Sequence, residues 1–435
     1  MRRTYDAVII GAGVIGAAIA YELAMRGYKT LNIDKYPAAG YGPTSSSCAI
    51  VRAHYSTWDG VAMAFENFSY WEDWEGYIGV DDERGFAQYE RCGTILLKSP
   101  DGHWRKVLNH YRSIGVAFEE WDAATLKQRA PHYSPQMFWP PSRPDDERFW
   151  EPQSREVEGA IFTPGSGYVN DPQLATHNLQ LAAEASGGEF LFREEVIAIR
   201  QNRERVEGIT LKSGAKIDAP IVVNVAGPWS FLVNRMAGVE QSMRIKTRAL
   251  RHEVHHVPAP AGLDFRLTGH HVSDGDQAIY FRPEAGNAIL IGSEDARCDP
   301  QIWVDNPDDY DREITQSQWE AQVYRLARRL PGLRIPHEKR GVVDLYDVSD
   351  DWIPIYDRSD LEGYFMAIGT SGNQFKNAAG VGFLMAELID ACQEGHDHDR
   401  EPVRVRCRYT GLVLNAGFYS RNRELNPDSS FTVNG

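Results

Sequence analysis

Three glycines near the start of the chain have the spacing of a phosphate-binding turn. They are Gly11, Gly13 and Gly16 in the sequence GAGVIG. Gly11 permits a tight turn, Gly13 lets the backbone approach a pyrophosphate, and Gly16 allows a helix to pack closely on a strand while its free amides face the phosphates. Asp34 follows at about twenty residues' distance, where a carboxylate can accept hydrogen bonds from ribose hydroxyls. The combination predicts a dinucleotide-binding site.

The segments around these glycines predict the elements that would hold them. Residues 5–10 (YDAVII) predict a short strand, and the helical spacing of apolar residues after the glycines ends at Gly27. Residues 29–33 predict a second strand that leads to Asp34. A lone glycine motif is weak evidence because such a turn also occurs without a ligand, but here every part of the unit is in place. The unit indicates an α/β fold and does not separate FAD from NAD.

Three later segments are also rich in glycine and in small or hydroxyl residues. Residues 40–47 (GYGPTSSS) would let backbone and hydroxyls wrap an extended cofactor. Residues 221–226 (IVVNVA) have the pattern of a buried strand and are closed by the sequence GPWS. Near the end of the chain, GTSGNQFKNAAGVG precedes a helix rich in small residues. These segments predict a site assembled from distant parts of the chain.

Composition excludes several function classes. The 435 residues carry 46 Lys plus Arg against 61 Asp plus Glu, a formal charge of -15, so nucleic acid is not an expected partner. The five cysteines are scattered without a C-x-x-C pair, which is typical of a reducing compartment without disulfides or structural zinc. No apolar run approaches the roughly 18 residues of a membrane span. The basic start followed by apolar residues continues into the glycine motif and not into a cleavage site. We therefore expect a cytoplasmic protein with no transmembrane segment.

Seven segments together resemble the D-amino-acid oxidase superfamily of FAD-dependent oxidoreductases, in the branch of sarcosine oxidase, glycine oxidase and dimethylglycine dehydrogenase. They occur in the family's order and span nearly the whole chain: GAGVIG, TSSSCAIVRAHY, GYVNDPQL, VVNVAGPWS, YFRPEAGNAILIG, DDWIPI and GTSGNQFKNAAGVG. Each segment alone is a weak signal. Their combination and order make the resemblance specific.

The resemblance implies an α/β (α+β) fold with two domains. A Rossmann-like FAD-binding domain would be assembled from residues 1–90, 155–235 and 340–400. A substrate-binding domain with a large mixed or antiparallel β-sheet would use residues 91–154 and 236–339. Strand-like runs at residues 94–97, 252–257 and 288–291 agree with this division. Residues 135–152 are expected to form a long loop, and residues 401–435 a C-terminal extension that covers a surface or a partner.

The resemblance also implies where FAD would be bound, without a covalent bond. The turn before Lys376 would bring the N-terminus of the last long helix to the flavin, where negative charge accumulates on reduction. A helix cap without a ligand is the alternative. The implied cofactor contacts are Gly11, Gly13, Val14, Ile15, Gly16, Asp34, Lys35, Thr44, Ser45, Ser46, Val196, Gly227, Trp229, Gly369, Gly372, Asn373, Gln374 and Lys376.

Four residues are candidates for the reaction site. Arg52 and Lys376 match positions that hold the substrate carboxylate in sarcosine oxidase, where Arg gives a bidentate grip and Lys a point charge. Each could instead be an exposed surface cation. His54 lies near the place of a flavin-proximal histidine, and Tyr55 matches an aromatic residue of the same motif. A hydrogen-bonded histidine is the alternative for His54.

Two positions depart from the pattern of monomeric sarcosine oxidase. Asp344 stands where that enzyme bonds its flavin through a cysteine, so this attachment is expected to be absent. Leu290 stands where its oxygen-activating lysine would fall. Because a cation beside the flavin stabilises superoxide, its loss favours a dehydrogenase slightly over an oxidase.

Other candidate residues have competing interpretations. Arg282 could bind a second anionic group of the substrate or form a structural salt bridge with Glu284 or Glu294. The histidines of HEVHH and GHH resemble metal ligands by number alone, but adjacent histidines on a strand point to opposite faces. No metal site is expected.

These observations favour an FAD-dependent oxidoreductase of secondary or N-methyl amino acids. In the family that it resembles, a hydride passes from the carbon beside the nitrogen to the flavin, and water hydrolyses the imine. The electron acceptor would be oxygen, an electron-transfer protein or a quinone. Two alternatives stay open: a flavin oxidoreductase of a 2-hydroxy acid or glycerol phosphate, and a non-catalytic flavoprotein subunit of a larger complex. The oligomeric state does not follow from the sequence.

Overall fold

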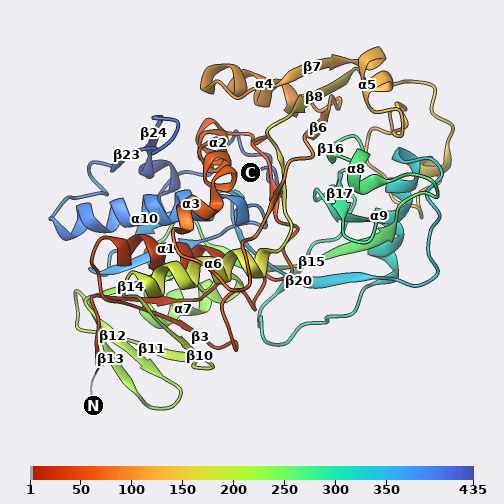
Figure 1. Cartoon of the computed structure of the whole chain (residues 1–435). Helices are drawn as coiled ribbons and strands as arrows, with labels where there is room; N and C mark the ends of the chain where they lie inside the picture. Colours follow the sequence, from red (N-terminus) through yellow and green to blue (C-terminus); the bar gives the residue numbers. More distant parts are fainter. Residues whose placement is uncertain (1–2) are drawn as a thin grey trace.

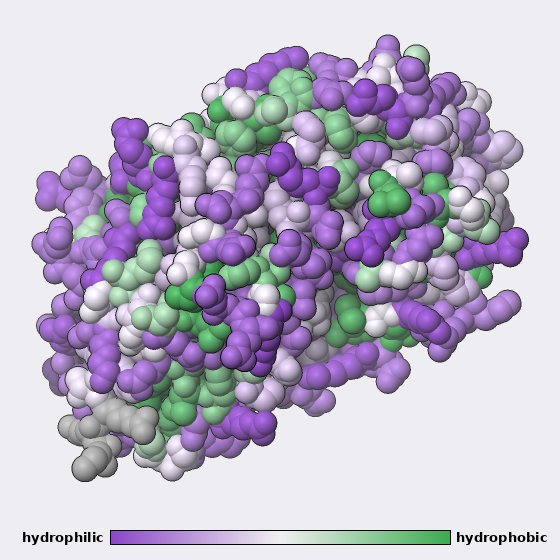
Figure 2. All heavy atoms as spheres, in the orientation of Figure 1, coloured by the Kyte–Doolittle hydropathy of each residue, from purple (hydrophilic) through white to green (hydrophobic). Residues whose placement is uncertain are grey.

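The computed structural model describes residues 3–435 and divides into two regions, each built on a large sheet (Figure 1). One region lies around helices α1 (Val14–Met25), α6 (Pro172–Ala185) and α10 (Ala378–Gln393). The other lies around strands β15 (Thr247–Pro258), β16 (His271–Asp274) and β17 (Ile279–Glu284) and helix α9 (Gln316–Arg329). Hydrophilic residues cover most of the face in Figure 2, with smaller hydrophobic patches between them. No helix of the described residues is long and apolar enough to cross a membrane.

The first region contains a six-stranded sheet. Its strands, in order across the sheet, are β10 (Glu189–Phe192), β3 (Thr30–Asp34), β2 (Ala7–Ile10), β14 (Ile221–Asn224), β22 (Tyr364–Ile368) and β21 (Ile355–Arg358). All neighbours are parallel except β21, which runs antiparallel to β22. The central strands β2, β14 and β22 are buried along their whole length, as expected for a parallel sheet covered on both faces.

Helices cover one face of this sheet. Helix α1 (Val14–Met25) packs between α6 (Pro172–Ala185) and α10 (Ala378–Gln393). Gly382 makes the close approach possible, because a Cβ there would lie 2.8 Å from the Ala18 carbonyl oxygen. The opposite face packs against α7 (Ser230–Ala237) and a four-stranded sheet of β1 (Arg3–Thr4), β13 (Lys216–Asp218), β12 (Val206–Leu211) and β11 (Val196–Gln201).

The second region contains a nine-stranded mixed sheet. Its path is β19 (Ile302–Val304), β15 (Thr247–Pro258), β18 (Ala288–Ser293), β17 (Ile279–Glu284), β16 (His271–Asp274), β6 (Thr94–Leu97), β8 (Gly159–Thr163) and β7 (Glu119–Asp122), with β20 (Gly341–Ser349) paired to β15. Only β16 and β6 pair in parallel. Helix α9 (Gln316–Arg329) covers the sheet through Trp319, Val323 and Leu326.

Shorter elements complete the chain. The remaining helices are α2 (Trp58–Glu72), α3 (Trp74–Ile78), α4 (His103–Ile114), α5 (Ala123–Arg129) and α8 (Phe265–Thr268). The 3₁₀ turns are η1 (Glu147–Trp150), η2 (Gly227–Trp229), η3 (Glu240–Ser242), η4 (Phe375–Asn377) and η5 (Ala416–Tyr419). The small strands are β4 (Ile50–Val51), β5 (Tyr89–Glu90), β9 (Gly167–Val169), β23 (Arg404–Arg406) and β24 (Val413–Asn415).

The α/β class and the two large sheets agree with the sequence analysis, and the three strand-like runs are strands or parts of strands. Two strands differ from the proposed domain division. β8 and β20 lie inside the ranges 155–235 and 340–400, yet they belong to the nine-stranded sheet because they pair with β6 and β15. These two strands do not fit the predicted domain boundaries, and the division into domains stays a proposal. The predicted loop at residues 135–152 contains one regular element, the turn η1.

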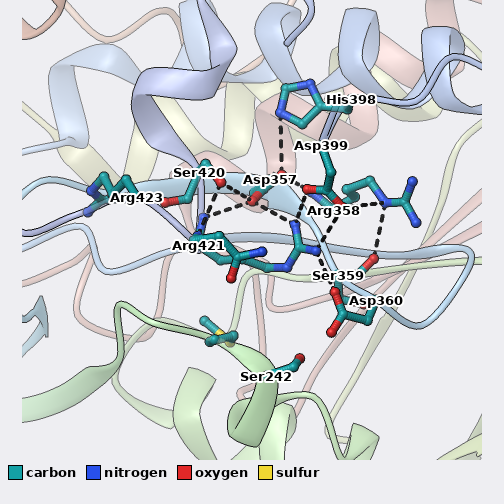
Figure 3. A network of polar contacts seen from close by, with 12 residues as sticks. Ser242, Asp357, Arg358, Ser359, Asp360, His398, Asp399, Ser420, Arg421 and Arg423 are labelled. Atoms are coloured by element: carbon teal, nitrogen blue, oxygen red, sulfur yellow. Dashed lines mark hydrogen bonds and ion pairs between the residues drawn. The ribbon is translucent and has the colours of Figure 1, made fainter. Parts of the chain in front are cut away.

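The C-terminal extension is tied to the first region by a polar network around the buried Arg421 (Figure 3). The Arg421 guanidinium is fully buried and pairs with Asp357 at 3.0 Å, with Asp360 at 2.6 Å and with both oxygens of Asp399. Arg423 makes a two-point contact with Asp351 at 2.7 and 2.9 Å. This anchoring fixes the path of the residues that follow, which enter the cavity described next.

Candidate cofactor and substrate site

One elongated cavity joins the glycine turn to the 3₁₀ turn η4, across the junction of the two large sheets. Most of the predicted cofactor contacts line it: Gly11, Gly13, Val14, Ile15, Gly16, Asp34, Lys35, Thr44, Ser46, Val196, Gly227, Trp229, Gly372, Asn373, Gln374 and Lys376. The structure therefore brings together residues that are more than 350 positions apart in the chain.

The glycine turn leaves no room for side chains. A Cβ at Gly11 would lie 2.3 Å from the Val225 carbonyl oxygen, and Gly11 has φ +111°, which side-chain-bearing residues rarely adopt. A Cβ at Gly16 would lie 2.0 Å from the Gly11 carbonyl oxygen. Helix α1 starts directly after Gly13, and its first three residues line the cavity; Val14 N donates to Thr44 Oγ1 at 3.2 Å. The turn is thus a backbone cradle at a helix N-terminus, as an anion requires.

Asp34 is fixed at the end of β3. Its carboxylate accepts hydrogen bonds from Ala12 N at 2.7 Å and Tyr36 N at 2.9 Å. Burial raises the pKa of Asp34, while these two amides act against the shift. The two amides orient the carboxylate at the cavity wall, where ribose hydroxyls would meet it.

Lys35 and Trp229 close the same end of the cavity. Lys35 pairs with Asp308, and its ammonium lies 4.0 Å from the centre of the Trp229 ring. The Trp229 indole donates to the same carboxylate at 3.0 Å. These contacts join the β3 end, the η2 turn and the loop before α9 around the glycine-turn end.

The other end of the cavity is built by the turn before α10. Gly372 has φ +70°, and a Cβ there would lie 2.3 Å from the Tyr346 ring, so only glycine allows the backbone to lie against this ring. Gly369 does not line the cavity, in contrast to the expectation; its amide donates at 2.6 Å to the carboxylate of Asp347, which does line it. Ser45 also lies outside the cavity, since its hydroxyl donates to the Gly42 carbonyl within an exposed turn.

Arg52 and Lys376 are the two cations at this end, and both are buried, with 6% and 3% of their surface exposed. Neither makes a salt bridge with a carboxylate among residues 3–435. Arg52 donates to the His54 carbonyl and, at 2.6 Å, to the Val433 carbonyl, and Lys376 donates to the Asn373 carbonyl at 2.6 Å. Burial, and then the Arg52 charge, hold the pKa of Lys376 well below its usual value. The surface-cation alternative is therefore wrong for both residues.

His54 and Tyr55 lie behind the cavity wall and do not line it. The Tyr55 hydroxyl donates to the Asn373 carbonyl at 2.5 Å, and its ring lies 4.9 Å from the Arg52 guanidinium and 5.0 Å from the Lys376 ammonium. The His54 ring stacks on His271 at 5.8 Å, and burial lowers the pKa of His54 well below its usual value. Both residues support the cations from behind, because the chain turns away from the cavity after Arg52.

We call the end of the cavity near Arg52 and Lys376 the reaction end. Several residues that line it were not predicted as site residues. They are His271, Glu294, Tyr346, Val433 and Asn434, joined by Tyr280 and Cys48. The Tyr280 hydroxyl lies 3.2 Å from Cys48 Sγ and 3.5 Å from the Tyr346 hydroxyl. Cys48 and Tyr280 lie in two of the segments that carry the family resemblance, and His271 lies in the GHH run, although none of the three was named as a site residue. The positions of Glu294, Tyr346, Val433 and Asn434 depend on strand pairing or on the path of the C-terminal extension.

Asp344, Leu290 and Arg282, the other residues singled out from the sequence, lie in three different environments. Asp344 lines the cavity and accepts a hydrogen bond from the Tyr310 hydroxyl at 3.2 Å. Leu290 is buried in an apolar cluster with Val254 and Tyr280. Arg282 does not line the cavity; it pairs with Glu284 at 2.9 Å and donates to the Cys48 carbonyl, so the structural interpretation of this residue holds.

Two of the three histidines of the HEVHH segment, His252 and His255, pair with carboxylates. His252 lies 2.9 Å from Asp295, and His255 lies 3.2 Å from Glu253, on opposite faces of β15. No group of three or more His, Cys, Asp or Glu residues suited to a metal ion occurs within residues 3–435.

Comparison with known proteins identifies the family. A family model described as FAD dependent oxidoreductase (DAO) matches residues 6–388. Glycine oxidase of Geobacillus kaustophilus is 24% identical over 409 residues, which cover 91% of this chain and 96% of that protein. Monomeric sarcosine oxidase of Streptomyces avermitilis is 22% identical over 406 residues, which cover 89% and 94%.

Solved structures agree on the fold. L-proline dehydrogenase from P. horikoshii has a TM-score of 0.75 at 20% identity, over 97% of this chain and 98% of that one. Glycine oxidase from Geobacillus kaustophilus has a TM-score of 0.72 at 20% identity, over 98% and 100%. These likenesses confirm the predicted fold class.

The cavity fits the cofactor that the family name states. The backbone cradle at Gly11 to Gly16 suits a pyrophosphate, Asp34 is oriented for ribose hydroxyls, and the cavity continues from there to Lys376. The predicted resemblance is thereby confirmed along most of the chain. The protein belongs to the FAD dependent oxidoreductase (DAO) family, and FAD is its cofactor.

Proposed function

We propose that the protein oxidises the C–N bond of a secondary or N-methyl amino acid. The observation that carries this proposal is the pair Arg52 and Lys376, two buried cations at the reaction end that have no carboxylate partner of their own among residues 3–435. Burying two cations side by side costs free energy unless an anion joins them. A substrate carboxylate would supply that anion.

The chain's part in the reaction is to bind and orient the substrate. Arg52 keeps guanidinium N–H groups beyond the two donated to carbonyls, and these can contact a carboxylate. Lys376, whose pKa is low without a neighbouring anion, would gain its full charge when the carboxylate binds beside it. The substrate would then be fixed at one end, with its amine and the adjacent carbon directed toward the middle of the cavity.

The bound FAD supplies the acceptor for a hydride that leaves the carbon beside the nitrogen. Water then hydrolyses the imine product to an amine and a carbonyl compound. We further propose that FAD is held without a covalent bond, since Asp344 lines the cavity at the position where a cysteine would attach it. The apolar Leu290 stands where the oxygen-activating lysine of monomeric sarcosine oxidase would fall, which favours an electron acceptor other than oxygen, such as an electron-transfer protein or a quinone.

We also propose that the protein is located in the cytoplasm. All five cysteines are free thiols, which is typical of a reducing compartment.

Substitution of the two cations tests the proposal. Arg52→Met and Lys376→Met should each weaken binding and flavin reduction by an N-methyl amino acid by about 10- to 100-fold, because each removes a charge-assisted contact worth roughly 1.5–3 kcal/mol. The FAD content of the purified variants should stay near that of the wild type. The measurement is anaerobic flavin reduction followed by visible absorbance at increasing substrate concentration.

Matched controls separate this effect from a loss of surface charge. Arg84 and Lys216 are exposed and do not line the cavity, so Arg84→Met and Lys216→Met should behave as the wild type. Unchanged reduction in both cavity variants would remove Arg52 and Lys376 from the substrate site.

A further inference from the structure

The reaction end of the cavity also holds a buried carboxylate, Glu294. It follows β18 directly, and its amide donates to the Ala278 carbonyl at 2.9 Å. The strand register explains its position: β16 pairs Ser273 with Tyr280, and β17 pairs Tyr280 with Gly292. The side chain of Glu294, 6% exposed, therefore turns toward the cavity beside β16.

Glu294 has one hydrogen bond within the described chain. Ser273 Oγ donates to Oε1 at 2.5 Å, while Oε2 has no hydrogen bond from residues 3–435. No Lys, Arg or His of this range lies within salt-bridge distance of the carboxylate. A buried carboxylate without a cationic partner is costly to ionise, as are the unpaired cations at the same end of the cavity.

The charged groups around Glu294 come from several elements. Arg52 on the segment after β4 favours the ionised form, whereas Asp274 on β16 and Asp101 before α4 disfavour it. Burial is the largest influence and raises the pKa of Glu294 to about 8. Lys376 and His271 line the same end of the cavity, but neither forms a contact with Glu294.

One cavity thus presents two cations and one carboxylate that do not pair with each other. This arrangement is complementary to a zwitterion, which carries a carboxylate at one end and a protonated amine at the other. A neutral hydroxyl in place of the amine would leave the buried Glu294 without a cation.

We propose that Glu294 binds the ammonium group of the substrate and accepts one of its protons before the C–N bond is oxidised. The N–H bond breaks, the proton forms an O–H bond with Glu294 Oε2, and the freed electron pair stays on nitrogen. The nitrogen can then support departure of a hydride from the adjacent carbon. This assignment rests on the proposed amine substrate and adds the group that recognises and deprotonates it.

Two probes with the holoenzyme test the assignment. N-methylglycine carries both charged ends, whereas methoxyacetate keeps the carboxylate and has an ether oxygen in place of the amine. We expect Glu294→Gln to weaken binding and anaerobic reduction by N-methylglycine at least 10-fold near pH 7. Binding of methoxyacetate, measured by perturbation of the flavin absorption spectrum, should change less than about 3-fold, because Arg52 and Lys376 are intact.

The pH profile gives a readout that a structural role would not move. In the wild type, the apparent second-order rate constant for flavin reduction should rise through an ionisation near pH 8, and Glu294→Gln should abolish that ionisation. Ser273→Ala removes the single hydrogen bond to the carboxylate and should shift the ionisation upward, which keeps the test valid if the Gln variant does not hold FAD. Glu83→Gln, at an exposed position, is the control.

The outcomes separate two kinds of failure. Equal weakening of both probes, or an unchanged pH profile in Glu294→Gln and Ser273→Ala, would overturn the assignment of Glu294. If no secondary or N-methyl amino acid reduces the wild-type flavin, the proposed function itself fails, whatever the variants do.

Discussion

At the scale of residues, the site is distinguished by buried charges that lack charged partners within the described chain. Arg52, Lys376 and Glu294 all line the reaction end of one cavity, and each is at least nine-tenths buried. Most other buried charges are paired, such as Arg251 with Glu253 at 2.6 Å. A pattern in which charges are left for a ligand is typical of a binding site and not of a structural core.

The raised pKa of Glu294 predicts how stability depends on pH. Its pKa is about 8 in the folded protein and near 4.5 when exposed, so the folded state holds a proton that the unfolded state has lost between these values. The stabilising contribution is complete below pH 4.5 and is lost as the pH rises through 8. Glu294→Gln should therefore gain stability relative to the wild type, by a few kcal/mol, as the pH increases.

Chemical denaturation of both proteins at several pH values measures this difference. Asp347, whose pKa burial raises to about 7, contributes a parallel loss in both proteins and does not obscure the comparison. A difference that stays constant from acid to alkaline pH would contradict the prediction.

Residues coded by local motifs were predictable from the sequence, whereas those placed by long-range pairing were not. Gly11, Asp34 and Arg52 lie in or next to segments whose own pattern indicates a cofactor site, and all three line the cavity. Glu294 reaches the cavity only because β16, β17 and β18 pair in one register. The sequence motif around His54 was informative, but it did not reveal that the chain turns behind the cavity wall at that residue.

At the scale of elements, the site depends on two turns that only glycine can form. The first joins β2 to α1 at Gly11, and the second lies before α10 at Gly372, against the Tyr346 ring. The first turn places the N-terminus of α1 at one end of the cavity, and the second leads into η4, whose Phe375 and Lys376 line the other end. The six-stranded sheet holds the two turns in a fixed relation, because β2 and β22 both flank β14.

Gly11→Ala should abolish FAD binding, since the added Cβ would lie 2.3 Å from a backbone oxygen at a strained φ of +111°. Gly27→Ala is the matched control: φ is +86°, but nothing lies within 4 Å of the added Cβ. That variant should lose about 1 kcal/mol of stability and keep its FAD. The ratio of flavin to protein absorbance after purification measures the FAD content of both variants. A yellow Gly11→Ala protein would contradict the prediction.

At the scale of the whole molecule, the C-terminal extension completes the site instead of merely covering a surface. Arg421 and Arg423 anchor it to the first region (Figure 3), and Val433 then places its carbonyl on Arg52 at 2.6 Å and on Asn373 Nδ2 at 3.0 Å. This path could not be predicted from local sequence patterns, because the contact joins residues 381 positions apart.

Arg421→Met should lower the free energy of unfolding by about 3–5 kcal/mol, because Asp357 would remain fully buried without its cation and the exposed Asp360 and Asp399 would lose theirs. Carboxylate binding at Arg52 should change as well, since the extension loses its anchor. Arg400→Met, at an exposed position, is the control. Wild-type stability in the Arg421 variant, measured by chemical denaturation, would show that the network does not hold the extension.

The central claim is that the cavity binds a zwitterionic secondary or N-methyl amino acid and oxidises its C–N bond. The most direct test is anaerobic titration of the FAD-loaded wild-type protein with N-methylglycine, N,N-dimethylglycine and proline, and in parallel with glycolate, lactate, glycerol 3-phosphate and the carboxylate-free dimethylamine. Loss of visible flavin absorbance with at least one of the amino acids, and with none of the other four compounds, is the predicted result. Reduction by a hydroxy acid or glycerol 3-phosphate but by no amino acid, or no reduction by any compound, would contradict the claim.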